Sequence, residues 1–223
     1  MAQKSFSPLL IPILFMTMAP LWCQAQAVNP FTEEVNALSD QYAELWDANR
    51  ETIVFTGSSS IRMWKDLSTR FADQQIINTG FGGSQASDLD YFLDELVLRY
   101  QPGKVFIYEG DNDIAAKKRA REIMATLKNI IQRIRSVDAR TKIYLIAAKP
   151  SLRRWKLRGK YRRLNRKFNR LAKKDALLYF VDVWTPMLNG RKLKQDIFIA
   201  DGLHMNPKGY DIWYTAMKEF VNP

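Results

Sequence analysis

The stretch IVFTGSSS, residues 53–60, joins a run of apolar residues to a polar turn that begins with glycine. Two later stretches repeat this order: IINTGFGGS at 76–84 and VFIYEGDND at 105–113. A short apolar run followed by turn residues is typical of a strand that is buried on both faces of a parallel sheet. The three stretches therefore predict parallel strands whose polar turns gather at one edge of the sheet.

Helical patterns alternate with these strands along the rest of the chain. Residues 142–147 and 177–181 are two further apolar runs of strand length. Amphipathic helices are predicted over Phe31–Leu45 after Asn29-Pro30, over Ala86–Tyr100, over Lys117–Ser136, over Tyr161–Leu171, and from Asn206-Pro207 to Phe220. Strands that alternate with helices imply right-handed crossovers and a parallel sheet. The predicted fold is α/β, a three-layer α/β/α sandwich with a five-stranded parallel sheet.

The composition restricts the chemistry that this chain can perform. Apolar residues make up 47% and charged residues 26% of 223 residues, which are the values of a globular chain of one domain. The chain has one histidine and one cysteine. These counts exclude a zinc site with two histidines, a CxxC redox motif and a disulfide framework. Any imidazole chemistry therefore belongs to His204.

The N-terminal residues have the pattern of a secretory signal. Lys4 is the single charged residue among the first 32, Pro8–Trp22 is apolar, and Ala25-Gln26-Ala27 is a cleavage site of the small-x-small kind. The apolar run is shorter than the roughly 20 residues that span a membrane. We expect residues 1–27 to be a signal peptide and residues 28–223 to be the mature domain, exported to the periplasm or the cell exterior.

Two alternatives for the N-terminus are an uncleaved membrane anchor and a lipid anchor at Cys23. A lipoprotein signal requires a small residue before the cysteine, and the large Trp22 stands there. Cleavage near Ala27 would leave a mature chain without cysteine.

The predicted turns carry the groups that acyl transfer to water requires: a nucleophile, a base, a group that orients the base, and donors for the oxyanion. His204 is the base by elimination, and Asp201 in the segment DGLH is near enough to reach its other ring nitrogen. Ser58–Ser60 compete for the role of nucleophile. The oxyanion donors are predicted to be a backbone N–H of the serine turn, one of the glycine loop, and the side-chain amide of Asn112.

Four sequence blocks carry a resemblance to a known family: Gly57-Ser58-Ser59, NTGFGG, GDND and DGLH. In this order over residues 57–204, they resemble the SGNH hydrolases, also called the GDSL esterase family. The resemblance implies a flavodoxin-like fold and hydrolysis of carboxylic esters without a metal or an organic cofactor. By motif, it implies a nucleophile at Ser59, an orienting carboxylate at Asp201, a base at His204, and oxyanion donors at Ser59, Gly83 and Asn112.

Two positions depart from the common pattern of that family. Ser58 stands where the name-giving motif has aspartate, and Asp111 stands where many members have glycine. Both departures resemble a subgroup with the pattern GSSSIR…W and GDND, which this chain matches at Gly57–Arg62 and Trp64. We expect them to bear on the substrate more than on the reaction. Asp111 and Asp113 are expected to form hydrogen bonds within their loop rather than to bind a metal.

The basic residues are concentrated in one segment. The chain has 34 Lys and Arg against 23 Asp and Glu, and Lys149–Lys174 holds 13 of the basic residues and no acidic one. One interpretation is a solvated helix face. The other is contact with an anionic membrane or an envelope polymer, which export favours over nucleic acid. The segment follows a predicted strand end, which places Arg153, Arg154 and Trp155 near the mouth of the site.

The sequence thus predicts an exported serine esterase that acts on acyl or acetyl groups of a lipid or carbohydrate. One alternative is an O-acyltransferase of envelope polysaccharide, which would use the same site. The other is a polyanion-binding module with a vestigial site.

Overall fold

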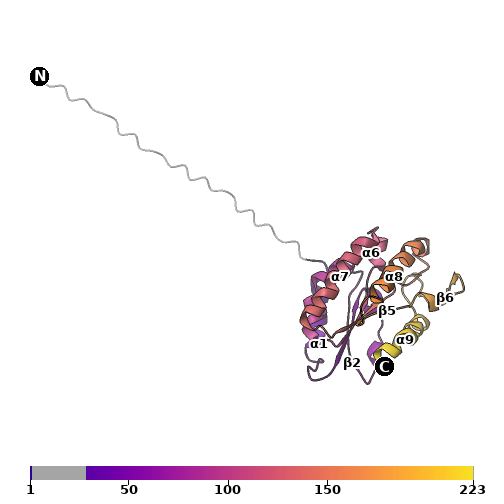
Figure 1. The fold of residues 1–223 in the computed structure, drawn as a ribbon, viewed down its shortest axis with the longest axis horizontal. Coiled ribbons are helices and arrows are strands. Elements are labelled where there is room, and N and C mark those ends of the chain that lie inside the picture. Colours follow the sequence, from indigo (N-terminus) through magenta and orange to yellow (C-terminus); the bar gives the residue numbers. More distant parts are fainter. Residues whose placement is uncertain (2–28, 223) are drawn as a thin grey trace.

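The computed structural model describes Met1 and residues 29–222, and its main sheet has five parallel strands (Figure 1). They are β1 (Thr52–Gly57), β2 (Gln75–Gly80), β3 (Lys104–Tyr108), β4 (Lys142–Ile146) and β5 (Leu178–Val181). Their order is β2-β1-β3-β4-β5. This doubly wound order confirms the predicted α/β/α sandwich. The expected signal peptide, residues 1–27, lies outside the described residues apart from Met1.

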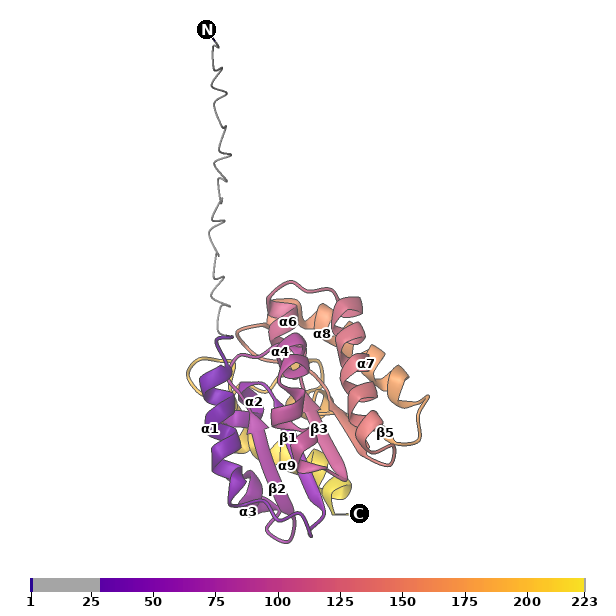
Figure 2. The same ribbon diagram turned by 90° about the vertical axis from the view of Figure 1, so that its left-hand side faces the viewer.

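Helices cover both faces of the sheet. The α-helices are α1 (Thr32–Ala43), α2 (Ser59–Arg62), α3 (Leu67–Arg70), α4 (Ala86–Tyr91), α5 (Leu93–Leu96), α6 (Asp111–Ala115), α7 (Ala120–Val137), α8 (Arg158–Ala172) and α9 (Pro207–Val221). The 3-10 helices are η1 (Leu98–Tyr100), η2 (Trp155–Leu157) and η3 (Thr185–Met187), and a two-stranded ribbon joins β6 (Leu188–Asn189) to β7 (Lys192–Leu193). Figure 2 shows α4 and α7 on one face of the sheet and α9 on the other. Within the described residues, no helix has the length and apolar character that crossing a membrane requires.

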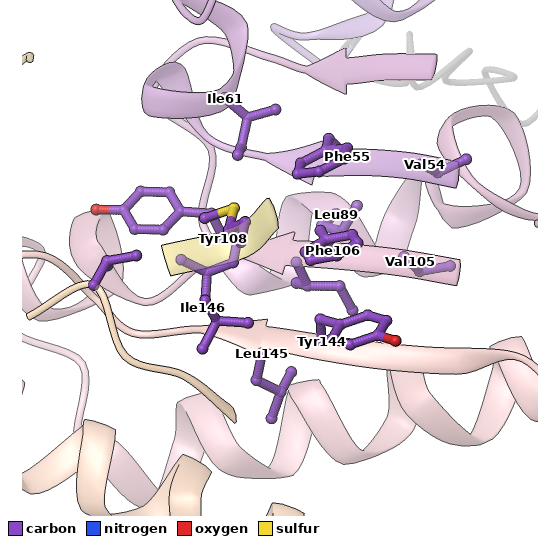
Figure 3. Close-up of a cluster of buried hydrophobic side chains, with 14 of the residues drawn as sticks. Val54, Phe55, Ile61, Leu89, Val105, Phe106, Tyr108, Tyr144, Leu145 and Ile146 are labelled. Atoms are coloured by element: carbon purple, nitrogen blue, oxygen red, sulfur yellow. The ribbon is translucent and has the colours of Figure 1, made fainter. Parts of the chain in front are cut away.

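A row of stacked aromatic rings crosses the sheet on the face that α9 covers (Figure 3). Phe55, Phe106, Tyr144 and Tyr179 are paired in register on four neighbouring strands. Their ring centroids are 4.3, 4.3 and 4.7 Å apart in that order. Phe220 of α9 packs on Tyr144 at 5.4 Å. Cross-strand pairs of this kind fix the register, so the carboxyl ends of these strands, and the turns that follow them, lie level with one another.

The segment Ala86–Tyr100 differs from the single helix that its periodicity predicts. The structure divides it into α4, α5 and η1. The carbonyl oxygen of Asp90, which would accept a hydrogen bond within a continuous helix, accepts one from the guanidinium of Arg133 on α7 instead. A tertiary contact therefore replaces the local hydrogen bond and breaks the helix. Most apolar side chains of the segment are still buried, whereas Tyr91 is 67% exposed.

Candidate active site

Three side chains form one line of hydrogen bonds at the carboxyl edge of the sheet. A hydrogen bond of 2.9 Å joins Ser59 Oγ to Nε2 of His204. The other ring nitrogen, Nδ1, lies 2.5 Å from Oδ2 of Asp201. Ser59 and His204 are 145 residues apart in the chain, so the fold itself brings them together.

The loop between residues 201 and 204 holds the aspartate in its charged form. Its Oδ1 accepts hydrogen bonds from the backbone N–H groups of Leu203, at 2.8 Å, and His204, at 2.9 Å. Burial opposes ionisation of Asp201, but these amides and the His204 ring outweigh it and lower the pKa of the carboxyl to about 2. An ionised carboxylate at this position favours the ring tautomer that has its proton on Nδ1 and a free Nε2 facing the serine.

The environments of the three serines differ. Ser58 and Ser60 are buried, with 2% and 3% of their surfaces exposed, whereas Ser59 is half-buried. The Ser58 N–H donates to the carbonyl of Tyr108, and the Ser60 carbonyl accepts from the hydroxyl of Tyr210. Among these serines the hydrogen bond to the imidazole is that of Ser59, which begins α2 directly after β1.

The glycine loop after β2 presents a backbone amide at the same edge. Gly83 has a φ of +79°, a conformation that favours glycine, and a Cβ built there would meet no atom within 4 Å. Within the described part of the chain, its N–H makes no backbone or side-chain hydrogen bond. The backbone conformation, rather than lack of space, therefore favours glycine at this position, and the amide is available to a ligand.

Asn112 lies on α6, which follows β3, and both ends of its amide are held. Its Oδ1 accepts hydrogen bonds from Nη1 and Nη2 of Arg154, each at 3.0 Å. Its Nδ2 donates to the carbonyl of Ser84 at 2.8 Å. Since a guanidinium only donates, Arg154 determines which end of the amide is oxygen and turns the NH₂ group toward the glycine loop. One N–H of Nδ2 remains for another acceptor.

A buried charge cluster lies behind that asparagine. Asp111 is 4% exposed and its carboxylate accepts hydrogen bonds from Arg154, at 2.6 Å, and from the hydroxyls of Tyr108 and Tyr161. Burial alone would raise the pKa of Asp111, but the positive charges of Lys149 and Arg154 outweigh it, so the pKa is lowered. The position that departs from glycine in the family pattern thus anchors the arginine that holds Asn112.

Lys149 connects the same cluster to the histidine loop. Its side chain is fully buried, with Nζ 3.7 Å from Oδ2 of Asp111. Nζ also donates a hydrogen bond of 2.6 Å to the carbonyl of Leu203, the residue before His204. One buried carboxylate and two cations therefore connect α6, which carries Asn112, to the loop that carries His204.

Sequence reasoning assigned no role to Lys149 and treated it as part of a basic surface. The structure divides the segment Lys149–Lys174: Lys149 and Arg154 enter the site, and most of the basic residues of α8 are exposed. Arg154 is near the site, as its place after the fourth strand predicts. The additional aspartate in GDND, Asp111, could have indicated the roles of Lys149 and Arg154, because a buried carboxylate requires a positive partner.

The chain belongs to the GDSL-like lipase/acylhydrolase family, whose model matches residues 42–212. The predicted family is thus confirmed.

Solved structures share the fold at low sequence identity. A candidate platelet activating factor from Streptococcus pneumonia is 24% identical, with a TM-score of 0.73 over 85% of this chain and 93% of that one. A candidate acylhydrolase from Bacteroides fragilis is 22% identical, with a TM-score of 0.73 over 84% and 95%. An acetylxylan esterase from Geobacillus stearothermophilus is 17% identical, with a TM-score of 0.64 over 78% and 94%.

A curated relative is larger than this chain. The N-acylneuraminate cytidylyltransferase of Escherichia coli O18:K1:H7 is 26% identical over 175 residues, which are 76% of this chain and 40% of that enzyme. The similarity thus spans less than half of the relative.

Proposed function

We propose that this protein is a serine esterase in which Ser59, His204 and Asp201 form the catalytic triad. The observation that carries the proposal is the continuous line of hydrogen bonds from Ser59 Oγ through both ring nitrogens to Asp201. This is the arrangement by which a base activates a hydroxyl and a carboxylate orients the base.

In the first half of the reaction, Ser59 Oγ attacks the ester carbonyl carbon while Nε2 of His204 takes the hydroxyl proton. Asp201 stabilises the imidazolium and keeps its own charge, in agreement with its low pKa. When the tetrahedral intermediate collapses, the C–O bond to the alcohol breaks and Nε2 gives the proton to the departing oxygen. Water then repeats the sequence on the acyl-enzyme and releases the acid and free Ser59.

The oxyanion is stabilised by three donors: the N–H of Ser59, the N–H of Gly83 and the free N–H of the Asn112 side chain. Support comes from the unused amide of Gly83 and from the way that Arg154 turns the asparagine. Donors held in place before the reaction stabilise developing charge without a cost for reorganising them. Arg154 is thus a positioning residue for Asn112.

The proposed substrates are acyl or acetyl esters of a lipid or a carbohydrate. Two exposed apolar side chains, Leu152 and Ile199, each 41% exposed, flank the histidine loop. Leu152 lies against Gly202, and the Ile199 N–H donates to the carbonyl of His204. They offer an apolar surface to the acyl part of a substrate. We also propose that the protein is exported, on the pattern of residues 1–27.

The test compares alanine variants of the three adjacent serines and of the histidine with the wild type, using p-nitrophenyl acetate and butyrate. Ser59→Ala and His204→Ala should each lower kcat by about 10⁴-fold or more, because the triad acts as a unit. Ser58→Ala and Ser60→Ala are matched controls, since they remove the same hydroxyl without touching the imidazole, and they should retain most of the activity.

Wild-type rates in Ser59→Ala and His204→Ala would refute the triad. Loss of activity confined to Ser58→Ala or Ser60→Ala would identify that serine as the nucleophile instead. A fluorophosphonate should label Ser59, as mass spectrometry of the modified peptide would show. Analysis of products with and without an acceptor sugar distinguishes hydrolysis from acyl transfer. Acylated sugar as the main product would identify a transferase.

A further inference from the structure

A basic hollow opens between the start of α7 and the side of α8, and its lining includes neither the proposed triad nor the proposed oxyanion donors. It has a volume of about 400 Å³ and is lined by residues 117–121 at the α6–α7 turn and the start of α7, by Ile114 of α6, and by Lys160, Arg163 and Lys167 of α8. Figures 1 and 2 both show α6, α7 and α8 side by side at one end of the molecule. The four basic residues within 117–121 therefore lie across the hollow from three basic residues of α8.

The helical period explains how α8 supplies three cations to the hollow. Lys160, Arg163 and Lys167 recur at spacings of three and four residues, so they lie on one side of the helix. The buried stripe of Tyr161, Leu164 and Phe168 fixes the rotation of α8 against the protein. The packing of the core therefore directs these three side chains toward the α6–α7 turn.

The charges of the hollow are largely unbalanced. Within the described residues, Lys118 pairs with Asp113 at 3.5 Å and Arg119 pairs with Glu122 at 2.8 Å. The other five cations that line the hollow make no ion pair with a described residue. No acidic side chain is part of the lining. Five like charges around a small concave space repel one another, and an anion in that space would relieve the repulsion.

We propose that this hollow binds a compact ligand that carries several phosphate groups. A phosphate monoester has a charge of about −1.5 to −2 at neutral pH, so two or three such groups balance five cations, whereas a carboxylate carries one charge. The phosphate oxygens accept charge-assisted hydrogen bonds from the lysines and arginines on both walls. Ile114 and the alkyl stems of the basic side chains supply an apolar floor for the rest of the ligand.

This site is separate from the proposed catalytic function. None of its lining residues belongs to the triad or to the proposed oxyanion donors, although α6 carries both Asn112 and Ile114. The proposal also places the polyanion contact that was expected for Lys149–Lys174 on one side of α8, rather than along the whole helix. Ligand binding and ester hydrolysis can therefore be measured independently.

The experiment measures binding of tripolyphosphate to the full chain by titration calorimetry at low salt. The double variant Lys160→Gln/Arg163→Gln removes two lining charges. Arg166→Gln/Arg170→Gln is the matched control, because these arginines are exposed on α8, outside the lining, and the net charge changes equally. The first variant should weaken binding by about tenfold or more, since it removes two charge-assisted contacts. The control should stay within about twofold of wild type.

Citrate at equal ionic strength tests the chemical class of the ligand, and it should bind at least about tenfold more weakly than tripolyphosphate. Equal weakening by both double variants would show diffuse attraction and overturn the site. Tight binding of citrate would overturn the phosphate assignment, and absence of tripolyphosphate binding would overturn both. Ser59→Ala should bind tripolyphosphate like wild type, and both double variants should hydrolyse p-nitrophenyl acetate normally, so a failed site and a failed esterase give different results.

Discussion

The two parts of the basic segment have similar composition and opposite environments. Lys149 and Arg154 lie against Asp111, with side chains 0% and 18% exposed, and they form the ion pairs of the buried cluster. Arg163 and Lys173, on and after α8, lie at the surface. The difference follows from position: the first pair comes directly after β4 at the carboxyl edge of the sheet, where a buried acid is present. The role of a basic residue in this segment therefore depends on whether it has a buried acidic partner, and not on how many basic residues surround it.

The largest expected effect is the loss of stability in Lys149→Met. The variant removes a cation beside buried Asp111 and leaves the Leu203 carbonyl without its donor, which should lower the free energy of unfolding by about 3 kcal/mol. Urea denaturation followed by fluorescence measures this. Lys173→Met, at an exposed position, is the matched control and should change stability by less than about 0.5 kcal/mol. Similar losses in both variants would refute the distinction between the two parts of the segment.

The second prediction concerns the link between Arg154 and catalysis. Arg154→Met should lower kcat by about 10²-fold with little change in KM, because Asn112 loses the partner that orients its NH₂ group as an oxyanion donor. Arg154→Lys, which keeps the charge but not the two-pronged contact, should recover part of the rate.

The test of mechanism is a double-mutant cycle with Asn112→Ala. In that background Arg154→Met should cost little further activity, because the group that it positions is absent. Additive losses would mean that the arginine acts on activity by another route, such as general stability, and would contradict its role as a positioning residue.

The smallest effect should come from Glu109, a buried acid that makes no ion pair with a described residue. It is 1% exposed and accepts a hydrogen bond from Ser84 at 2.7 Å. Burial, together with the nearby charge of Asp113, raises its pKa well above the ordinary value. Below a pH of about 4.5, the pKa of glutamate in the unfolded chain, the contribution of the protonated form to stability is fully present. This contribution is lost as the pH rises through the higher pKa of Glu109 in the folded protein.

Glu109→Gln keeps the shape of the side chain and has no charge to bury. Its melting temperature should match that of wild type near pH 4 and exceed it at pH 8, by a margin that grows with pH. Thermal unfolding across that range measures the difference. A variant that is less stable than wild type at pH 8 would show that the ionised carboxylate is tolerated in the fold.

The sequence predicted the strands and the order of the blocks because both depend on local patterns. The apolar runs at β1, β2 and β3 and the turns after them lie where periodicity placed them. The last helix also begins as expected, since the Asn206 side chain accepts a hydrogen bond from the N–H of Gly209. The choice among Ser58–Ser60 stayed open on the residues themselves, because it depends on which side chain a distant loop approaches.

The errors and omissions have a common physical cause. The single helix predicted over Ala86–Tyr100 is broken by Arg133, which lies more than 30 residues away in the chain. The burial of Lys149 depends on Asp111, which begins α6, and on Leu203, which lies in the loop before α9. Contacts between distant segments override local propensity. Neither local patterns nor the number of charged residues indicates which of these contacts will form.

The distance along the chain between Ser59 and His204 has a consequence for how this enzyme forms. The bond between them closes a loop of 145 residues, and all five strands of the sheet lie in or beside that loop. Contacts between residues so far apart are slow to form, because the entropy of closing the loop opposes them until the intervening structure is in place. With the proposed triad, we therefore expect esterase activity to emerge late in folding, after the strands between the two residues have paired.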